Sequence, residues 1–128
     1  MWCRGIRGAI TVSENTKEAI IAASKELLQN LMEANEVEIS DVACILFTTT
    51  PDLNAAFPAT AARELGWTNV PLLCGHEMNV PGSLSRCLRI LVLLNTNKRN
   101  EEIVHVYLGD AETLRAEEEK PWQNEGKK

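Results

Sequence analysis

Aromatic residues are scarce in this chain, at 5% of 128 residues. Hydrophobic residues still make up 45%, so aliphatic side chains must fill the core of what this length predicts to be one compact domain. The chain lacks any apolar stretch of about 20 residues, the length that a membrane helix needs. Charged Arg4 and Arg7 interrupt the first apolar segment, unlike in a signal peptide. We therefore expect no membrane association.

The sequence also lacks the patterns of disulfide and metal sites. Its four cysteines are Cys3, Cys44, Cys74 and Cys87. None forms a C-x-x-C pair, and a chain with a good core gains little from disulfides, so we expect reduced thiols in a cytoplasmic protein. Cys74 and His76 form a C-x-H pair, but there is no second pair of standard form to complete a zinc site. The net charge of −5 argues against nucleic acid and acidic membranes as main partners.

The hydrophobic pattern predicts an α/β (α+β) protein with a five-stranded mixed sheet. Strands are expected at 2–12, 42–50, 70–78, 86–95 and 103–108, and helices at 16–34 and 58–65. Asn15 is expected to cap the first helix, with Glu18 three residues on. In this order both helices cover one face of the sheet, and self-association is the simplest way to bury the other. We expect a single domain over 1–115 and a charged, flexible tail over 116–128.

Two of the arginines lie near the middle of predicted strands. Arg7 falls in the first strand, and Arg89 falls in the otherwise aliphatic segment 86–95, where it shares a face with Cys87 and Leu91. Arginine is almost never fully buried unless it is paired, so an anion is expected near each. An internal salt bridge with a carboxylate is an equally good interpretation at this point.

The balance of charges near these strands favours a ligand over an internal pair. Two carboxylates, Glu77 and Asp52, are the candidate internal partners, whereas Arg63 and Arg115 add two more cations to the two strand arginines. Guanidinium groups bind carboxylates through two parallel hydrogen bonds. The sequence therefore predicts a pocket for an anionic ligand.

Three further residues have both a structural and a functional interpretation. Glu77 ends a predicted strand, where a carboxylate is usually solvated, but it can also accept a hydrogen bond from a ligand hydroxyl, with the Cys74 thiol as a weak second donor. Tyr107 is the only tyrosine and is by default a half-buried strand residue.

The chain has no G-x-S-x-G, G-x-G-x-x-G or Cys-His-Asn signature, which argues against nucleophilic or nucleotide chemistry of standard form.

Four long segments make the sequence recognisable. They are RGIRGAITV near the start, TTTPDLNAAFPATAARELGW in the middle, VPLLCGHEMNVPGSLSRCLRILV after it, and HVYLGDAETLR. Together, in this order and spacing, they closely resemble the monofunctional, trimeric bacterial chorismate mutases of the AroH class. The resemblance covers about residues 3–115, nearly the whole body of the chain.

The resemblance implies both a fold and a reaction. The family forms a pseudo-α/β-barrel from three subunits of a ferredoxin-like, Bacillus chorismate mutase-like fold, with an active site at each interface of the homotrimer. Its members are isomerases that convert chorismate into prephenate, a Claisen rearrangement in aromatic amino acid biosynthesis. The reaction is pericyclic and unimolecular, so it needs no metal, cofactor, base or nucleophile. Catalysis consists of holding the compact conformer of the dianion and stabilising charge at the ether oxygen.

The resemblance also implies a role for particular residues. Arg7 is expected to bind a substrate carboxylate, and Arg89 to reach both a carboxylate and the ether oxygen of the breaking bond. Glu77 and Cys74 are expected to meet the ring hydroxyl, and Tyr107 to lie against the enolpyruvyl side. The remaining substrate-binding positions are Phe57, Ala59, Thr60, Arg63, Leu114 and Arg115, the last from a mobile C-terminal segment. Relatives often carry a lysine where this chain has Thr60, so slower entry of the dianion is expected here.

Two rival functions fit a small trimeric scaffold with an arginine pocket. One is an imine- or enamine-hydrolysing enzyme of the RidA-like kind, and the other is a non-catalytic module that binds an aromatic-pathway metabolite. Loss of chorismate absorbance on adding protein, without metal or cofactor, distinguishes all three. Because no titrating base takes part in a pericyclic reaction, the rate of a mutase is expected to vary little across neutral pH.

Overall fold

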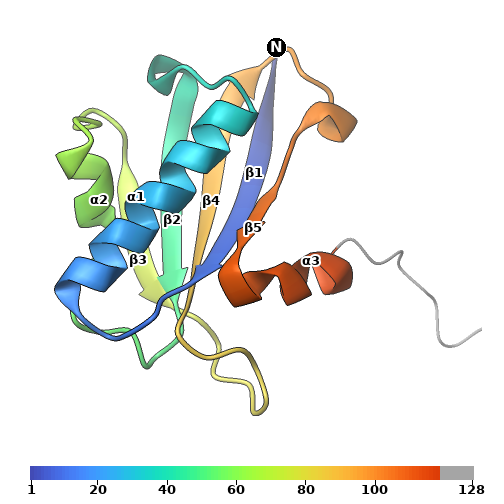
Figure 1. Cartoon of the computed structure of the whole chain (residues 1–128). Coiled ribbons are helices and arrows are strands. Elements are labelled where there is room, and N and C mark those ends of the chain that lie inside the picture. Colours follow the sequence, from blue (N-terminus) through green and yellow to red (C-terminus); the bar gives the residue numbers. More distant parts are fainter. Residues whose placement is uncertain (119–128) are drawn as a thin grey trace, which may run out of the picture.

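A single sheet, with its longest helix packed across one face, forms the body of the protein (Figure 1). The computed structural model describes residues 1–118. The strands are β1 (Trp2–Thr11), β2 (Val42–Thr49), β3 (Leu72–His76), β4 (Cys87–Thr96) and β5 (Val106–Leu108). The helices are α1 (Lys17–Ala34), α2 (Ala59–Glu64) and α3 (Glu112–Glu118), with 3₁₀ turns η1 (Ile39–Asp41), η2 (Asn100–Glu102) and η3 (Gly109–Ala111).

The sheet is mixed, as predicted. Its strand order is β3-β2-β4-β1-β5. The middle strand β4 pairs antiparallel with both β2 and β1, whereas β3 pairs parallel to β2 and β5 pairs parallel to β1 at the two edges. The first strand of the chain therefore lies between the last two.

Helix α1 packs across one face of this sheet (Figure 1). Its residues Leu27, Leu28 and Leu31 are fully buried, as are Ile6 on β1 and Ile90 on β4. Along a strand, successive side chains point to opposite faces of the sheet. The strand residues next to Ile6 and Ile90 therefore point away from α1. Burial of aliphatic side chains between α1 and the sheet accounts for most of the core, as the low aromatic content predicts.

The start of α1 differs from the prediction by one residue. Thr16 caps the helix, because its hydroxyl oxygen accepts a hydrogen bond from the backbone N–H of Ala19 at 3.2 Å. The predicted cap, Asn15, instead accepts hydrogen bonds from the backbone N–H groups of Asn54 and Ala55 at 3.0 and 3.1 Å. Asn15 thus holds the loop before α2. Pattern alone could not separate two adjacent residues that both cap well.

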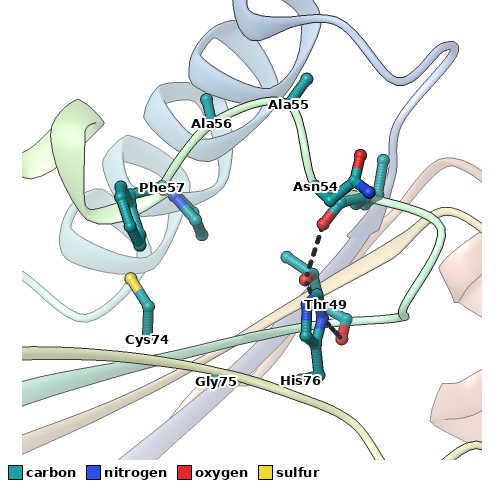
Figure 2. Close-up of a pocket in the computed structure, with 10 residues that line it drawn as sticks. Thr49, Asn54, Ala55, Ala56, Phe57, Cys74, Gly75 and His76 are labelled. Atoms are coloured by element: carbon teal, nitrogen blue, oxygen red, sulfur yellow. Dashed lines mark hydrogen bonds between the residues drawn. The ribbon is translucent and has the colours of Figure 1, made fainter.

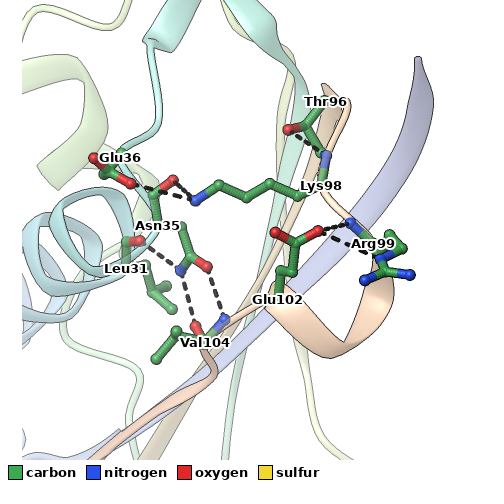
Figure 3. Close-up of polar contacts among 8 residues, drawn as sticks. All are labelled: Leu31, Asn35, Glu36, Thr96, Lys98, Arg99, Glu102 and Val104. Atoms are coloured by element: carbon green, nitrogen blue, oxygen red, sulfur yellow. Dashed lines mark hydrogen bonds and ion pairs between the residues drawn. The ribbon is translucent and has the colours of Figure 1, made fainter.

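The last strand is shorter than predicted. A strand was expected over 103–108, but only Val106–Leu108 pairs with β1. Before this strand, the side chain of Asn35 makes the hydrogen bonds that a neighbouring strand would make. Its Oδ1 accepts a hydrogen bond from the N–H of Val104, and its Nδ2 donates one to the carbonyl of Val104, both at 2.8 Å (Figure 3). Because an amide side chain, not a strand, pairs with the backbone of Val104, the strand is shorter than the alternating pattern of residues 103–108 predicts.

The C-terminal part contains a helix that was not predicted. Helix α3 runs to Glu118, so the expected boundary between residues 115 and 116 falls inside it. The rest of the expected tail, 119–128, lies outside the described residues, and its flexibility stays a prediction. Within residues 1–118, no helix combines the length and the apolar character needed to span a bilayer.

Candidate active site

The face of the sheet opposite α1 carries Arg7 and Arg89. Arg7 on β1 pairs with Leu91 on β4, and Ala9 pairs with Arg89, so the two arginines lie on the same face of neighbouring strands, two residues apart in register. Arg89 shares this face with Leu91, as predicted. The Arg89 side chain is 38% exposed and Arg7 is half-buried. We call this surface the open face.

Arg7 contacts the tyrosine of the neighbouring strand. Its Nε donates a hydrogen bond to the Tyr107 hydroxyl oxygen at 2.8 Å. Tyr107 is 1% exposed, and it packs with Ala9, Cys87 and Leu114 in a small cluster separate from the main core. The only tyrosine is therefore both a buried strand residue and a partner of Arg7.

Helix α3 adds a second arginine beside the same tyrosine. The guanidinium carbon of Arg115 lies 5.4 Å from the centre of the Tyr107 ring, close enough for attraction between cation and ring face. Arg115 Nη2 lies 3.6 Å from Glu112 Oε1. Its Nε is buried and has no hydrogen-bond partner among residues 1–118. This donor is therefore unsatisfied within the described residues.

Glu77 faces Arg89 on the open face. One residue past β3, its N–H donates to the Thr49 carbonyl at 2.7 Å, and its carboxylate accepts a hydrogen bond from the Thr48 hydroxyl. Glu77 Oε2 lies 3.6 Å from Arg89 Nε, and Thr48 is the register partner of Arg89 on β2. The internal pair considered from the sequence is thus present for Arg89. It leaves Arg89 exposed enough to meet a ligand as well.

Asp52, the other candidate partner for the strand arginines, instead accepts hydrogen bonds from loop residues. Its Oδ2 accepts a hydrogen bond from the backbone N–H of Arg86 at 2.9 Å, and its Oδ1 accepts one from the Thr50 hydroxyl at 2.5 Å. The hydrogen bond from Thr50 is the main cause that holds the pKa of Asp52 below its usual range. Arg86 has a positive φ of 46°, so this carboxylate fastens a strained turn just before β4.

A cavity of about 720 Å³ opens next to Arg89 and Glu77, within the usual size range for small-molecule sites. Beyond these two residues its lining comprises Thr50, Met78, Val80, Gly82, Ser83, Leu84, Ser85, Cys87, Thr113 and Leu114. Sequence reasoning missed most of this lining, and it also missed Thr48. The sequence NVPGSLS at 79–85 is typical of a turn-rich loop, and that pattern alone predicts no contact with a ligand. The hydroxyl of Thr48 could have been found from its position opposite Arg89 once the register of β2 and β4 was known.

The remaining predicted site residues lie elsewhere on the chain. Four of them lie in α2 or just before it: Phe57, Ala59, Thr60 and Arg63. Phe57 is 72% exposed and Ala59 is buried. Thr60 is half-buried and Arg63 is exposed. With Cys74 they form the second group, whereas Arg7, Glu77, Arg89, Tyr107, Leu114 and Arg115 form the first group. A separate cavity of about 380 Å³ is lined by Phe57 and Cys74 among others (Figure 2).

Cys74 does not meet Glu77 within one chain. Cys74 is the register partner of buried Phe47 on β2 and packs against the main core, so it points to the helix-covered side, whereas Glu77 points to the open face. In Figure 2 its sulfur is directed toward Phe57. Partial burial raises the pKa of the Cys74 thiol, partly offset by the Ala59 N–H and the charge of Arg63. Cys74 is therefore a thiol at neutral pH and suited to weak hydrogen bonding, not to nucleophilic attack.

Metal ligands do not gather in the described part of the chain. Across residues 1–118 there is no group of three or more His, Cys, Asp or Glu side chains that could hold an ion. Cys74 and His76 lie on one strand, and His76 Nδ1 lies 3.2 Å from the Thr49 hydroxyl. The site offers cations, hydroxyls and one carboxylate, a set that can bind and orient an anion.

Comparisons with known proteins agree with one another. A family model described as "Chorismate mutase type I" matches residues 3–118. The chain is 51% identical over 113 residues to chorismate mutase AroH of Thermus thermophilus, covering 88% of this chain and 93% of that protein. It is 45% identical over 116 residues to chorismate mutase AroH of Bacillus subtilis (strain 168), covering 90% and 91%. A solved chorismate mutase structure from Clostridium thermocellum superposes with a TM-score of 0.85 at 48% identity, over 88% of this chain and 99% of that one.

Proposed function

The chain belongs to the AroH class of type I chorismate mutases and is an isomerase that converts chorismate into prephenate, and we propose that each of its active sites is formed by two subunits of a homotrimer. The reaction belongs to aromatic amino acid biosynthesis. Neither the imine-hydrolysing alternative nor the non-catalytic module is supported by the matched family and relatives.

The observation that carries the two-subunit proposal is the separation of the predicted residues into two groups. The first group lies on the open face and beside α3, whereas the second group lies around α2 and on the helix-facing side of β3. In a cyclic trimer each subunit presents one surface to one neighbour and a different surface to the other. The first group of one subunit can then face the second group of the next. Exposed Leu73, at 65%, fits burial in such a contact.

Within that site we propose a division of labour among the cations. Arg7 and Arg115, on either side of Tyr107, bind substrate carboxylate. Arg89 binds a carboxylate and the ether oxygen, and Glu77 accepts a hydrogen bond from the ring hydroxyl. The carboxylate of Glu77 next to Arg89 also keeps the guanidinium in place before substrate arrives, which is the preorganisation that electrostatic catalysis requires.

The energetics fit a site of this kind. An acceleration of about 10⁶ corresponds to roughly 8 kcal/mol. Removal of one preorganised donor at a developing negative charge typically costs about 3 to 4 kcal/mol. Arg89 at the ether oxygen can supply that share, and restraint of the flexible dianion by the other cations supplies much of the rest. This mechanism calls on no metal, cofactor or general base.

The site proposal is tested by mixing two inactive variants. Arg89→Ala damages the first group, and Phe57→Glu places a negative charge in the second group at an exposed position that the fold does not need. If sites lie between subunits, trimers reassembled from equal amounts of both have one intact site whenever both variants are present, and about a quarter of wild-type activity returns. Each variant alone, checked as a trimer by light scattering, serves as the control. No recovery in mixed trimers would contradict the proposal.

We also propose that the protein acts in the cytoplasm. None of the four cysteines forms a disulfide within residues 1–118, and reduced cysteines are the usual state in a reducing compartment. Fractionation of cells followed by detection of the protein in the cytoplasmic fraction tests this. Recovery in an oxidising compartment would contradict it.

A further inference from the structure

His105 lies one residue before β5, and its ring reaches back to β1. The backbone N–H of Arg7 donates a hydrogen bond to His105 Nδ1 at 3.0 Å. The parallel pairing of β1 and β5 begins only at Gly8 and Val106. The imidazole therefore supplies the acceptor for a strand N–H at the point where the backbone ladder ends.

The same short segment contacts Arg7 twice. His105 accepts from its backbone, and Tyr107, two residues on, accepts from its Nε at 2.8 Å. Arg7 is thus held at its backbone and at its side chain by neighbouring positions of one segment. Displacement of residues 104–107 would move both contacts together.

This segment is itself anchored to α1 (Figure 3). Asn35, 2% exposed, makes the two hydrogen bonds to Val104 described above, and its Nδ2 also donates to the Leu31 carbonyl at 2.9 Å. Lys98 Nζ donates to the Asn35 carbonyl at 2.7 Å and lies 3.8 Å from Glu36 Oε1. A network from the end of α1 therefore fixes the residue that precedes His105.

We propose that His105 is a positioning residue for Arg7 and acts as a neutral imidazole with its proton on Nε2. A ring nitrogen accepts an N–H only through its lone pair, so Nδ1 must be unprotonated. Small displacements of a binding group lower the rate steeply, because catalysis depends on a closely defined geometry. The inference rests on the role proposed for Arg7 as a carboxylate-binding group.

Two substitutions separate positioning from packing. His105→Asn keeps an acceptor oxygen near the place of Nδ1, whereas His105→Leu fills similar space with no acceptor. We expect His105→Leu to lower kcat/KM about tenfold, the effect of one lost hydrogen bond, and mainly through KM. We expect His105→Asn to keep most of the wild-type kcat/KM. This difference between the two variants should persist even if both melt at the same temperature, below that of the wild type. Val104→Ala, at the exposed neighbouring position, is the matched control and keeps wild-type kinetics.

Each outcome decides the proposal. Wild-type kcat/KM in folded His105→Leu, or equal loss in both variants, would overturn it. Arg7→Ala, measured alongside, separates the two levels: full activity there would reject the role of Arg7 itself, whereas loss there with a normal His105→Leu rejects only the positioning role. If His105→Leu does not fold, ring ¹⁵N NMR of the wild-type protein decides. A proton on Nδ1 in the resting enzyme contradicts the proposal, and a proton on Nε2 supports it.

Discussion

The two faces of the sheet are built from the same strands but differ in chemistry. On the helix-covered face, Ile6, Ile90 and Val92 are fully buried against α1. On the open face, the intervening positions include Arg7 and Arg89. Alternation along a strand thus gives one residue to the core and the next to the site. We expect changes on the first face to alter mainly stability and changes on the second to alter mainly catalysis.

The largest effect is expected from Arg89. Arg89→Ala should lower kcat about 10² to 10³-fold, since it removes a preorganised donor from the developing charge, and Arg89→Lys should also be poor because a lysine cannot replace the planar guanidinium fork. Steady-state kinetics with chorismate checks both. Thermal melting is the control, because a half-exposed side chain contributes little to the core. Near-normal turnover in Arg89→Ala would reject the role proposed for it.

The neighbouring residue on the other face should behave in the opposite way. Ile90→Ala should lower the free energy of unfolding by about 2 to 5 kcal/mol, because it leaves a cavity under α1. Its kcat per folded molecule should stay close to wild type. Denaturant titration and kinetics well below the melting temperature measure the two effects. A fall in kcat as large as that of Arg89→Ala would break the distinction between the faces.

Gly8 tests how closely α1 approaches the sheet. A Cβ at this position would lie 3.0 Å from terminal carbons of both Leu27 and Leu31, so Gly8→Ala should destabilise the fold by about 1 to 3 kcal/mol through overpacking. The melting temperature measures this. Gly75→Ala is the matched control, because a Cβ there meets nothing within 4 Å. Equal melting temperatures for both variants would contradict the close approach.

Arg115 sharpens the comparison at the rim of the open face. Because it lies on α3 beside the Tyr107 ring, Arg115→Ala should weaken capture of substrate and lower kcat/KM more than kcat. Kinetics over a range of chorismate concentrations separates the two constants. A loss confined to kcat would instead place Arg115 at the reacting bond.

The smallest effect is expected at Asp52. Its lowered pKa means that its ionised form is favoured in the folded state, so its stabilisation is present above the pKa of the unfolded chain and is lost as pH falls through the lower, folded pKa. Asp52→Asn should therefore melt slightly below wild type at neutral pH, with the difference vanishing in acid. Melting curves at several pH values measure this. A difference that grows as pH falls would contradict the direction of the shift.

The sequence predicted the face of each strand better than its ends. Periodicity placed Arg89 opposite Ile90 because alternation is local. The length of β5 was overestimated because Asn35, 69 residues earlier in the chain, pairs with Val104, and no local pattern reveals such a contact. The expectation that Cys74 and Glu77 meet one ligand hydroxyl came from their residue types and from the family resemblance, which implies an assembled site. Within one chain, Cys74 points to the helix-covered face of the sheet and Glu77 points to the open face. The sequence pattern does not show this separation.

The strand order has a consequence for how the chain folds during synthesis. β1 precedes the other strands of residues 1–118, yet within these residues it pairs with β4 and β5 alone. It has no partner in the sheet until residues 87–96 have left the ribosome. Domains generally acquire structure as their segments emerge, and long-range pairings are slow to form. β1 therefore stays unpaired in the sheet while residues 12–86 are synthesised. The contacts of His105 and Tyr107 with Arg7 form later still.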